Sequence, residues 1–155
     1  MDGGTRAAQA LTDSGIEHTI TRHGQVASLE EAATARGVQP ADIIKTLVVR
    51  RGEGDFLFVL LPGDRAISWP KLRAFLAVNR ISLPGKDVAR EVTGYARGTI
   101  TPFGSLTALP VVADNSMVGR TVSIGAGEHG VAATLDADAA IAHLGAQVAD
   151  VTDPT

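Results

Sequence analysis

The most regular pattern along the chain is a pair of apolar runs, IIKTLVV (43–49) and FLFVLL (56–61), separated by the turn-forming residues Gly52 to Asp55. Two such runs around a short turn predict a β-hairpin. Residues two apart on a strand point to the same face, and both faces of the first run are mostly apolar. The pattern therefore predicts a strand that is covered on both sides.

Helix boundaries are marked by polar caps and glycine stops. Ser28 followed by Glu31 matches a capping box, and Gly37 ends that segment. The predicted helices span residues 5–14, 28–37, 68–78, 87–92 and 136–144. Further strands are expected at 17–21, 109–114, 121–125, 131–135 and 146–151, and residues 1–4 are expected to be loose. Because these elements do not follow a regular βαβ order, they predict one α+β domain over residues 1–155.

Composition narrows the possible chemistry. The chain has no cysteine, which excludes disulfides, thiol catalysis and cysteine-ligated zinc. Its four histidines lack metal-site spacing, and no Gly-x-Ser-x-Gly elbow is present, so no metal site and no serine triad are predicted. No apolar run has membrane-spanning length and the first ten residues do not resemble a signal peptide. We therefore expect a cytoplasmic protein with no membrane partner.

Charge is distributed unevenly. The net charge of −3 argues against a general nucleic-acid coat protein. Between residues 65 and 97, however, only Asp87 and Glu91 oppose seven basic residues. These are Arg65, Lys71, Arg73, Arg80, Lys86, Arg90 and Arg97. The middle of the chain could present a local basic face to phosphates, or these residues could be ordinary solvated helix faces.

Lys45 is the one charged residue inside the first apolar run. An ammonium in such a strand is costly unless it is paired, reaches water or meets an anion. Two interpretations follow. The lysine could lie near a strand end and extend into solvent, or it could be a cation at the floor of a site for a negatively charged ligand.

Two glycine-rich segments lie among the later predicted strands, one before residue 109 and one between the strands at 121–125 and 131–135. GAGEHG (125–130) fits G-x-G-x-x-G, but a dinucleotide site needs a helix after the glycines, whereas the strand-like VAATL follows here. A hairpin turn with exposed N–H groups is the better interpretation. Residues 94–104, with Pro102 and Phe103, are either a structural connection or the wall of a pocket. His23 and His129 lie beside glycines, where they are pocket-rim candidates or surface residues.

Taken together, four pieces resemble the YbaK family, also called the prolyl-tRNA synthetase-associated editing domain. The pieces are RHGQVASLEEAA (22–33), the IIKTLVV run with its lysine, GYARGTITPFG (94–104) and IGAGEHG (124–130). The resemblance covers residues 15 to 151 and implies a mixed, curved, partly barrel-like sheet flanked by helices. It also implies a free-standing aminoacyl-tRNA deacylase that removes a small amino acid, with tRNA-Pro as the expected carrier.

The resemblance implies the following site and partners. Catalytic roles would belong to Lys45, Gly98, Gly104 and Gly127. Substrate would contact His23, Thr46, Thr101, Pro102, Phe103, Gly125, Ala126 and His129. No cofactor is implied, and the partners would be the acceptor end of a mischarged tRNA and an aminoacyl-tRNA synthetase, with no DNA. The basic residues from 65 to 97 would contact the acceptor stem.

The chain departs from the resemblance at one place. The branch of the family that clears cysteinyl-tRNA carries an aspartate just after the glycine turn, whereas this chain has Val131 and Ala132. Specificity for cysteine is therefore in doubt. Two other functions stay open at this stage: a non-catalytic module that binds tRNA ends, nucleotides or a synthetase, and a nucleotide-dependent oxidoreductase suggested by the glycine pattern alone.

Overall fold

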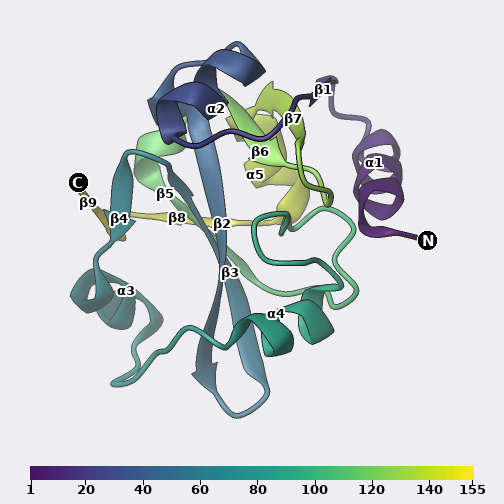
Figure 1. Ribbon diagram of the computed structural model, residues 1–155. Coiled ribbons are helices and arrows are strands. Elements are labelled where there is room, and N and C mark those ends of the chain that lie inside the picture. Colours follow the sequence, from purple (N-terminus) through teal and green to yellow (C-terminus); the bar gives the residue numbers. More distant parts are fainter.

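The two long apolar runs form antiparallel strands β2 (Ile43–Gly52) and β3 (Asp55–Pro62) at the centre of the computed structural model, which describes residues 1–155 (Figure 1). They belong to a seven-stranded sheet of order β1-β7-β6-β2-β3-β5-β8. The other strands are β1 (His18–Arg22), β5 (Val111–Asp114), β6 (Thr121–Gly125), β7 (Val131–Asp136) and β8 (Gln147–Ala149). The β2–β6, β3–β5 and β5–β8 pairs are parallel and the others antiparallel, so the sheet is mixed. Strands β1 and β8 are its free edges, and it is not a closed barrel.

Helices cover both faces of this sheet, as the two-sided apolar pattern predicted. Leu11, Ala89 and Ala140, from α1 (Gly3–Ser14), α4 (Lys86–Thr93) and α5 (Ala137–Leu144), share a core with Ile44 and Val48. On the other face, Leu72 of α3 (Trp69–Leu76) packs with Val49, while Ala32 and Ala33 of α2 (Leu29–Arg36) pack with Ile43. Consecutive residues of β2 therefore belong to two different cores. None of these helices has the length and apolarity needed to cross a membrane.

The predicted caps are confirmed, with one correction at the N-terminus. Ser28 Oγ accepts the N–H of Glu31 at 3.1 Å, and Gly37 ends α2 in the left-handed conformation. The chain was expected to be loose up to residue 4, but α1 already begins at Gly3. The cause is Asp2, whose carboxylate accepts the N–H of Thr5 at 2.7 Å and so satisfies a free donor of the first turn.

The C-terminus differs from the single strand expected at 146–151. Strand β8 ends at Ala149, and β9 (Thr152–Pro154) instead pairs with the three-residue strand β4 (Arg65–Ile67). Asp114 directs this change because its fully buried carboxylate accepts the N–H of Val151 at 3.0 Å. The Nε of Arg65 lies 3.8 Å from the same carboxylate. Elements of three residues carry too little alternation to be predicted from sequence.

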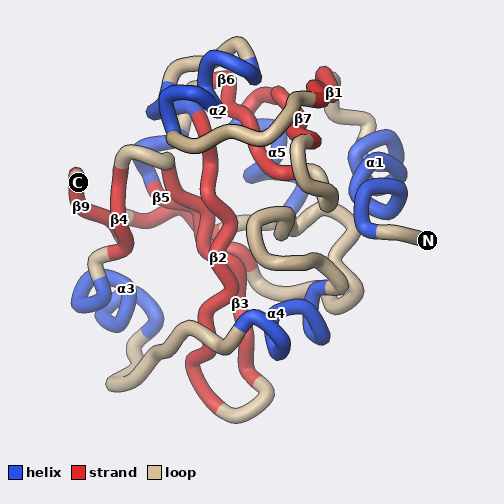
Figure 2. Tube along the Cα trace, in the orientation of Figure 1, coloured by secondary structure: helices blue, strands red, loops and turns tan.

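A long connection without regular structure links α4 to β5 (Figure 2). It contains the second glycine-rich segment, and α1 fixes it in place. The guanidinium of Arg6 donates to the carbonyls of Gly94 at 2.8 Å and Gly104 at 3.2 Å, and it lies 4.8 Å from the centre of the Tyr95 ring. The N-terminal helix thus holds a loop about ninety residues away in sequence, directly behind the site described next.

Candidate active site

A cavity of about 590 Å³ opens where the hydrogen-bond ladder of β2 is incomplete. Strand β2 pairs with β6 only at Ile43 and Ile44, and its outer edge is bonded again only at Arg50, which exchanges hydrogen bonds with Ser82. Main-chain groups alternate in direction along a strand. The N–H and C=O groups of Thr46 and Val48 therefore point to the same edge as those of Arg50 but have no strand partner there.

The cavity is lined by segments that are far apart in the sequence. They are β2, the end of α2, the segment that leads into α4, the loop after α4 and the end of β6. Four cationic side chains line it, namely Arg36, Lys45, Lys86 and Arg97, and no acidic side chain does. Apolar residues, including Ile44, Val48 and Ile100, form most of the rest of the wall, and Thr46 and three glycines complete it. Such a cavity attracts an anionic ligand that also has an apolar part.

Lys45 lines the cavity, as predicted, but its ammonium is also anchored. The Nζ donates to the carbonyl of Arg65 at 2.7 Å. Burial lowers the pKa of Lys45, and the nearby charge of Asp64 partly opposes this shift. No carboxylate lies within ion-pair distance of Nζ. An ammonium has three N–H donors, so two remain available to a ligand.

The two glycine segments meet at this cavity, as expected. Gly98 and Gly125 line it, and the N–H of Gly127 donates to the carbonyl of Thr99 at 3.1 Å, which ties the segments together. The N–H groups of Gly98 and Ile100 make no hydrogen bond within the protein. Main-chain donors are therefore free on the loop after α4, whereas the Gly127 donor is already engaged.

Several predicted site residues lie behind the cavity rather than in its lining. Thr101, Pro102, Phe103 and Gly104 are absent from the lining. Phe103 belongs to the main core, and its ring stacks on His143 with 5.9 Å between the ring centres. Its carbonyl accepts the hydroxyl of Tyr95 at 2.5 Å. These contacts make the Pro-Phe-Gly segment a support for the loop that carries Gly98.

The glycine turn between β6 and β7 is packed in a similar way. Ala126 is buried, its N–H donates to Val131, and a side chain at Gly127 would meet the carbonyl of Gly3 at 2.4 Å. The antiparallel β6–β7 pairing confirms a hairpin turn, so the strand–turn–helix order of a dinucleotide site is absent. Only Gly125, at the start of the turn, reaches the cavity.

The two candidate histidines lie near the cavity without lining it. The ring of His129 is exposed beside Gly98, where an added Cβ would be 3.5 Å from its Cε1. His23 is bonded through its main-chain N–H to the carbonyl of Gly130 at 2.8 Å, and its Nε2 is buried without a partner. His129 is therefore at the rim next to a lining glycine, whereas His23 is fixed to the end of the glycine turn.

Two polar atoms of the lining are buried without a partner: the hydroxyl oxygen of Thr46 and the Nε of Arg36. A buried polar group that lacks a hydrogen bond costs about 1–3 kcal/mol. Because both residues line a cavity, a molecule bound there is placed to supply the missing hydrogen bonds. Thr46 was among the predicted contacts, whereas Arg36 was not. As a basic residue in the last turn of a helix, Arg36 looks in the sequence like a favourable partner of the helix dipole.

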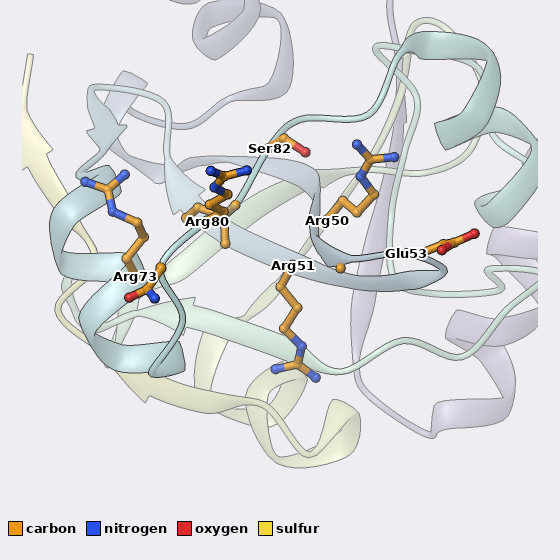
Figure 3. Close-up of a pocket in the computed structure, with 9 residues that line it drawn as sticks. Arg50, Arg51, Glu53, Arg73, Arg80 and Ser82 are labelled. Carbon is orange, nitrogen blue, oxygen red and sulfur yellow. The ribbon is translucent and has the colours of Figure 1, made fainter.

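The predicted basic face is only partly available. Lys71 is bonded to Asp150 at 3.1 Å and Asp153 at 2.9 Å, and Arg65 is held near Asp114. A second cavity of about 590 Å³ lies at the tip of the β2–β3 hairpin, lined by four arginines and one glutamate among its nine residues (Figure 3). These arginines are Arg50, Arg51, Arg73 and Arg80. Ser82 lines this second cavity and the next residue, Leu83, lines the first, so the two basic cavities are neighbours.

Known proteins match the chain over most of its length. Residues 23–141 match the family model of the aminoacyl-tRNA editing domain. A proline–tRNA ligase of Citrifermentans bemidjiense is 33% identical over 119 residues, which cover 72% of this chain and 20% of the ligase. A proline–tRNA ligase of Syntrophotalea carbinolica is 37% identical over 59% of this chain and 16% of the ligase. The chain thus spans about a fifth or less of the length of these relatives.

A solved structure described as a candidate trans-editing enzyme for prolyl-tRNA synthetase superposes with a TM-score of 0.88. It is 25% identical to this chain, and the alignment covers 99% of this chain and 98% of the other. The likeness therefore extends over both chains and includes every element that surrounds the cavity.

Proposed function

The chain belongs to the aminoacyl-tRNA editing domain family, and on this premise we propose that it hydrolyses the ester that joins an amino acid to the 3′-terminal adenosine of a mischarged tRNA. The observation that carries this proposal is the cavity itself. It combines four cations and no acid with main-chain donors that have no partner in the protein. A negatively charged RNA end that carries a reactive carbonyl fits both features.

The chemistry required of the site is modest because an aminoacyl ester is already activated. The enzyme must position a water molecule and stabilise the negative charge that develops on the carbonyl oxygen. The free N–H groups of Gly98 and Ile100 are the proposed donors for this oxygen. Loss of one such donor typically lowers the rate by about 10²–10³-fold. Gly104 and Gly127 then hold the loops in place instead of contacting the substrate.

The cavity lining contains no carboxylate and no imidazole. The proton of the attacking water is therefore assigned to the ribose oxygen that leaves, and the neighbouring hydroxyl of the adenosine is placed to relay it. Lys45, with two unused donors, is placed to bind ribose or phosphate oxygens of the same nucleotide. Its bond to the Arg65 carbonyl fixes the ammonium in one position, which favours a single geometry for the bound RNA end.

Substrate selection is proposed to depend on size and on the RNA. Branched side chains such as Ile44, Val48 and Ile100 restrict the apolar wall, and one methylene in such a pocket is worth about 1–3 kcal/mol. A small amino acid is therefore the expected acyl group of the substrate. The ligases described above are named for proline, which supports tRNA-Pro as the carrier and a prolyl-tRNA synthetase as the partner.

A panel of mischarged tRNAs tests the proposal. Alanyl- and cysteinyl-tRNA-Pro would be incubated with the protein, followed by seryl- and threonyl-tRNA species, and the release of amino acid measured. We expect release from at least one small-residue substrate and a loss of roughly a hundredfold or more in Lys45→Met. Lys71→Met, which removes a lysine outside the cavity, is the matched control and should keep the rate.

Two results would decide against the proposal. Binding of the tRNAs without release of any amino acid would favour a non-catalytic module that binds RNA ends. A wild-type rate in Lys45→Met, with an unchanged circular dichroism spectrum, would remove Lys45 from the mechanism.

A further inference from the structure

Arg36 occupies an unusual position for an arginine. It is the last residue of α2, and its side chain lines the cavity next to β2. One terminal nitrogen donates to the hydroxyl of Ser123 at 3.4 Å, which is a long bond, and the Nε is buried without a partner. No carboxylate lies within ion-pair distance. Of the five donors of the guanidinium, four are unused.

This arrangement lowers the stability of the fold, and the interactions of Arg36 within the protein offset little of that cost. Burial lowers the pKa of Arg36 because the charged form loses water. A cation at a helix C-terminus gains about 0.3–1 kcal/mol from the helix dipole, but an exposed side chain gains the same. Arg36 is half-buried, but its Nε–H is fully buried, and a buried donor without a partner is normally avoided. The guanidinium is therefore placed for a partner that the protein itself does not supply.

The location of the group indicates what the partner is. Ser123 is paired with Ile43 across the β2–β6 junction, where the strand edge becomes free. Lys45 lies two residues along β2 from Ile43 and points to the same face. Arg36 and Lys45 thus approach one end of the cavity together, with no acid between them in its lining. Two cations on one wall fit a ligand group that carries a full negative charge and several oxygens.

We propose that Arg36 binds the phosphate group of a 5′-phosphorylated nucleoside that occupies the cavity. A planar guanidinium can give two parallel N–H bonds to phosphate oxygens, which an ammonium cannot do. In the proposed function, on which this inference rests, the group is the phosphate between the last two nucleotides of the tRNA. A free nucleotide offers the same chemistry, so the source must be separated by experiment.

Nuclear magnetic resonance titrations with small ligands test the phosphate site directly. Adenosine, adenosine 5′-monophosphate and the trinucleotide CCA would each be titrated into the wild-type protein and into Arg36→Gln. We expect the monophosphate to bind wild type about 10–100-fold more tightly than adenosine, the range for a hydrogen bond to a charged group. In Arg36→Gln this difference should shrink to the part that Lys45 alone supplies, while the affinity for adenosine stays the same.

Arg90→Gln is the matched control, because Arg90 is exposed on α4, outside the cavity lining and in no ion pair. It should bind all three ligands like wild type. If CCA binds more tightly than the monophosphate and loses the same factor in Arg36→Gln, the natural ligand is an RNA end. If the two bind equally, it is a free nucleotide, and the phosphate site stands in either case. Equal binding of adenosine and its monophosphate by wild type, or an unchanged preference in Arg36→Gln, would refute the proposal.

Deacylation kinetics add a second test and keep the two proposals apart. Arg36→Gln should raise KM for the mischarged tRNA by about tenfold or more with kcat little changed, as expected for a binding contact, and Arg36→Lys should restore part of the loss. Active wild-type protein with an unaltered KM in Arg36→Gln would overturn only the role of Arg36. If wild type hydrolyses no tRNA in the panel, the proposed function fails, and the nucleotide titrations still decide on the phosphate site.

Discussion

The substitution Gly127→Ala separates a supporting role of the glycine turn from a catalytic one. Gly127 has φ +82°, and an added Cβ would lie 2.4 Å from the carbonyl oxygen of Gly3 and 2.7 Å from the Tyr95 ring. Both neighbours are fixed, the first in the main chain of α1 and the second by the hydrogen bond from its hydroxyl. The new methyl group therefore cannot be accommodated by rotation of a flexible side chain.

The expected cost has two parts. A non-glycine residue in the left-handed region costs about 1–2 kcal/mol. Overpacking of a tight contact adds about 1–3 kcal/mol, so the sum is about 2–5 kcal/mol. For a domain of this length, 1 kcal/mol corresponds to a change of about 2–4 °C in Tm. Gly127→Ala should therefore lower Tm by roughly 4–20 °C.

Gly119→Ala provides the matched control, because Gly119 has φ +77° but no atom within 4 Å of an added Cβ. It should show only the main-chain part, about 1–2 kcal/mol. Urea unfolding of the two variants, followed by circular dichroism, measures the difference. Equal stabilities would refute the packing argument. A Gly127→Ala variant that kept wild-type stability but was inactive would return Gly127 to the reaction itself.

Three further substitutions test other parts of the structure. Gly98→Ala adds a methyl group 3.5 Å from His129 at φ +88°, so it should cost about 1–2 kcal/mol of stability yet lower deacylation strongly, measured by urea unfolding and amino-acid release. Ser28→Ala removes a helix cap and should lower the unfolding free energy by about 1 kcal/mol. Burial acts to raise the pKa of Asp114, but hydrogen bonds from Ser116 and Val151 outweigh it and hold that pKa below 3.8. The stabilisation by the Asp114 carboxylate is therefore complete above pH 3.8 and is lost as the pH falls through the folded-state pKa. At neutral pH, Asp114→Asn should lower the unfolding free energy by about 1.5–3 kcal/mol. Urea titrations at acid pH should show the unfolding free energies of the two proteins converging.

Local rules predicted most of the elements. The central hairpin, the capped helix after Ser28 and the turn at residues 125–130 follow from patterns within ten or so neighbouring residues, and all three are present. The short strands β4 and β9 were missed because their pairing depends on Asp114, a buried carboxylate nearly forty residues away from its partner at Val151. Contacts across such distances leave no periodic signal in the sequence.

The candidate site was predictable only where one residue type was out of place. Lys45 is recognisable in the sequence as a cation in an apolar strand, and Thr46 is its neighbour on that strand. Arg36 gave no such signal, because a basic residue before a helix-ending glycine is ordinary. The glycine loops were expected to meet, but the sequence does not tell which N–H groups are free. Gly98 lines the cavity with an unused donor, whereas the donor of Gly127 is bonded to Thr99.

The free edge of β2 explains why familiar catalytic residues are absent. An inner strand normally bonds its main-chain donors and acceptors to two neighbouring strands. Here β6 pairs with β2 only up to Ile44, and the next main-chain partner on that edge of β2 is Ser82, which is bonded to Arg50. The gap supplies polar groups that no side chain has to provide, in a cavity lined by cations. Because an activated ester needs positioning more than a strong base, a site of this kind can act with side chains that mainly bind. Substitutions of lining cations other than Lys45, such as Arg36, should then change KM first, and changes that close the strand edge should abolish turnover.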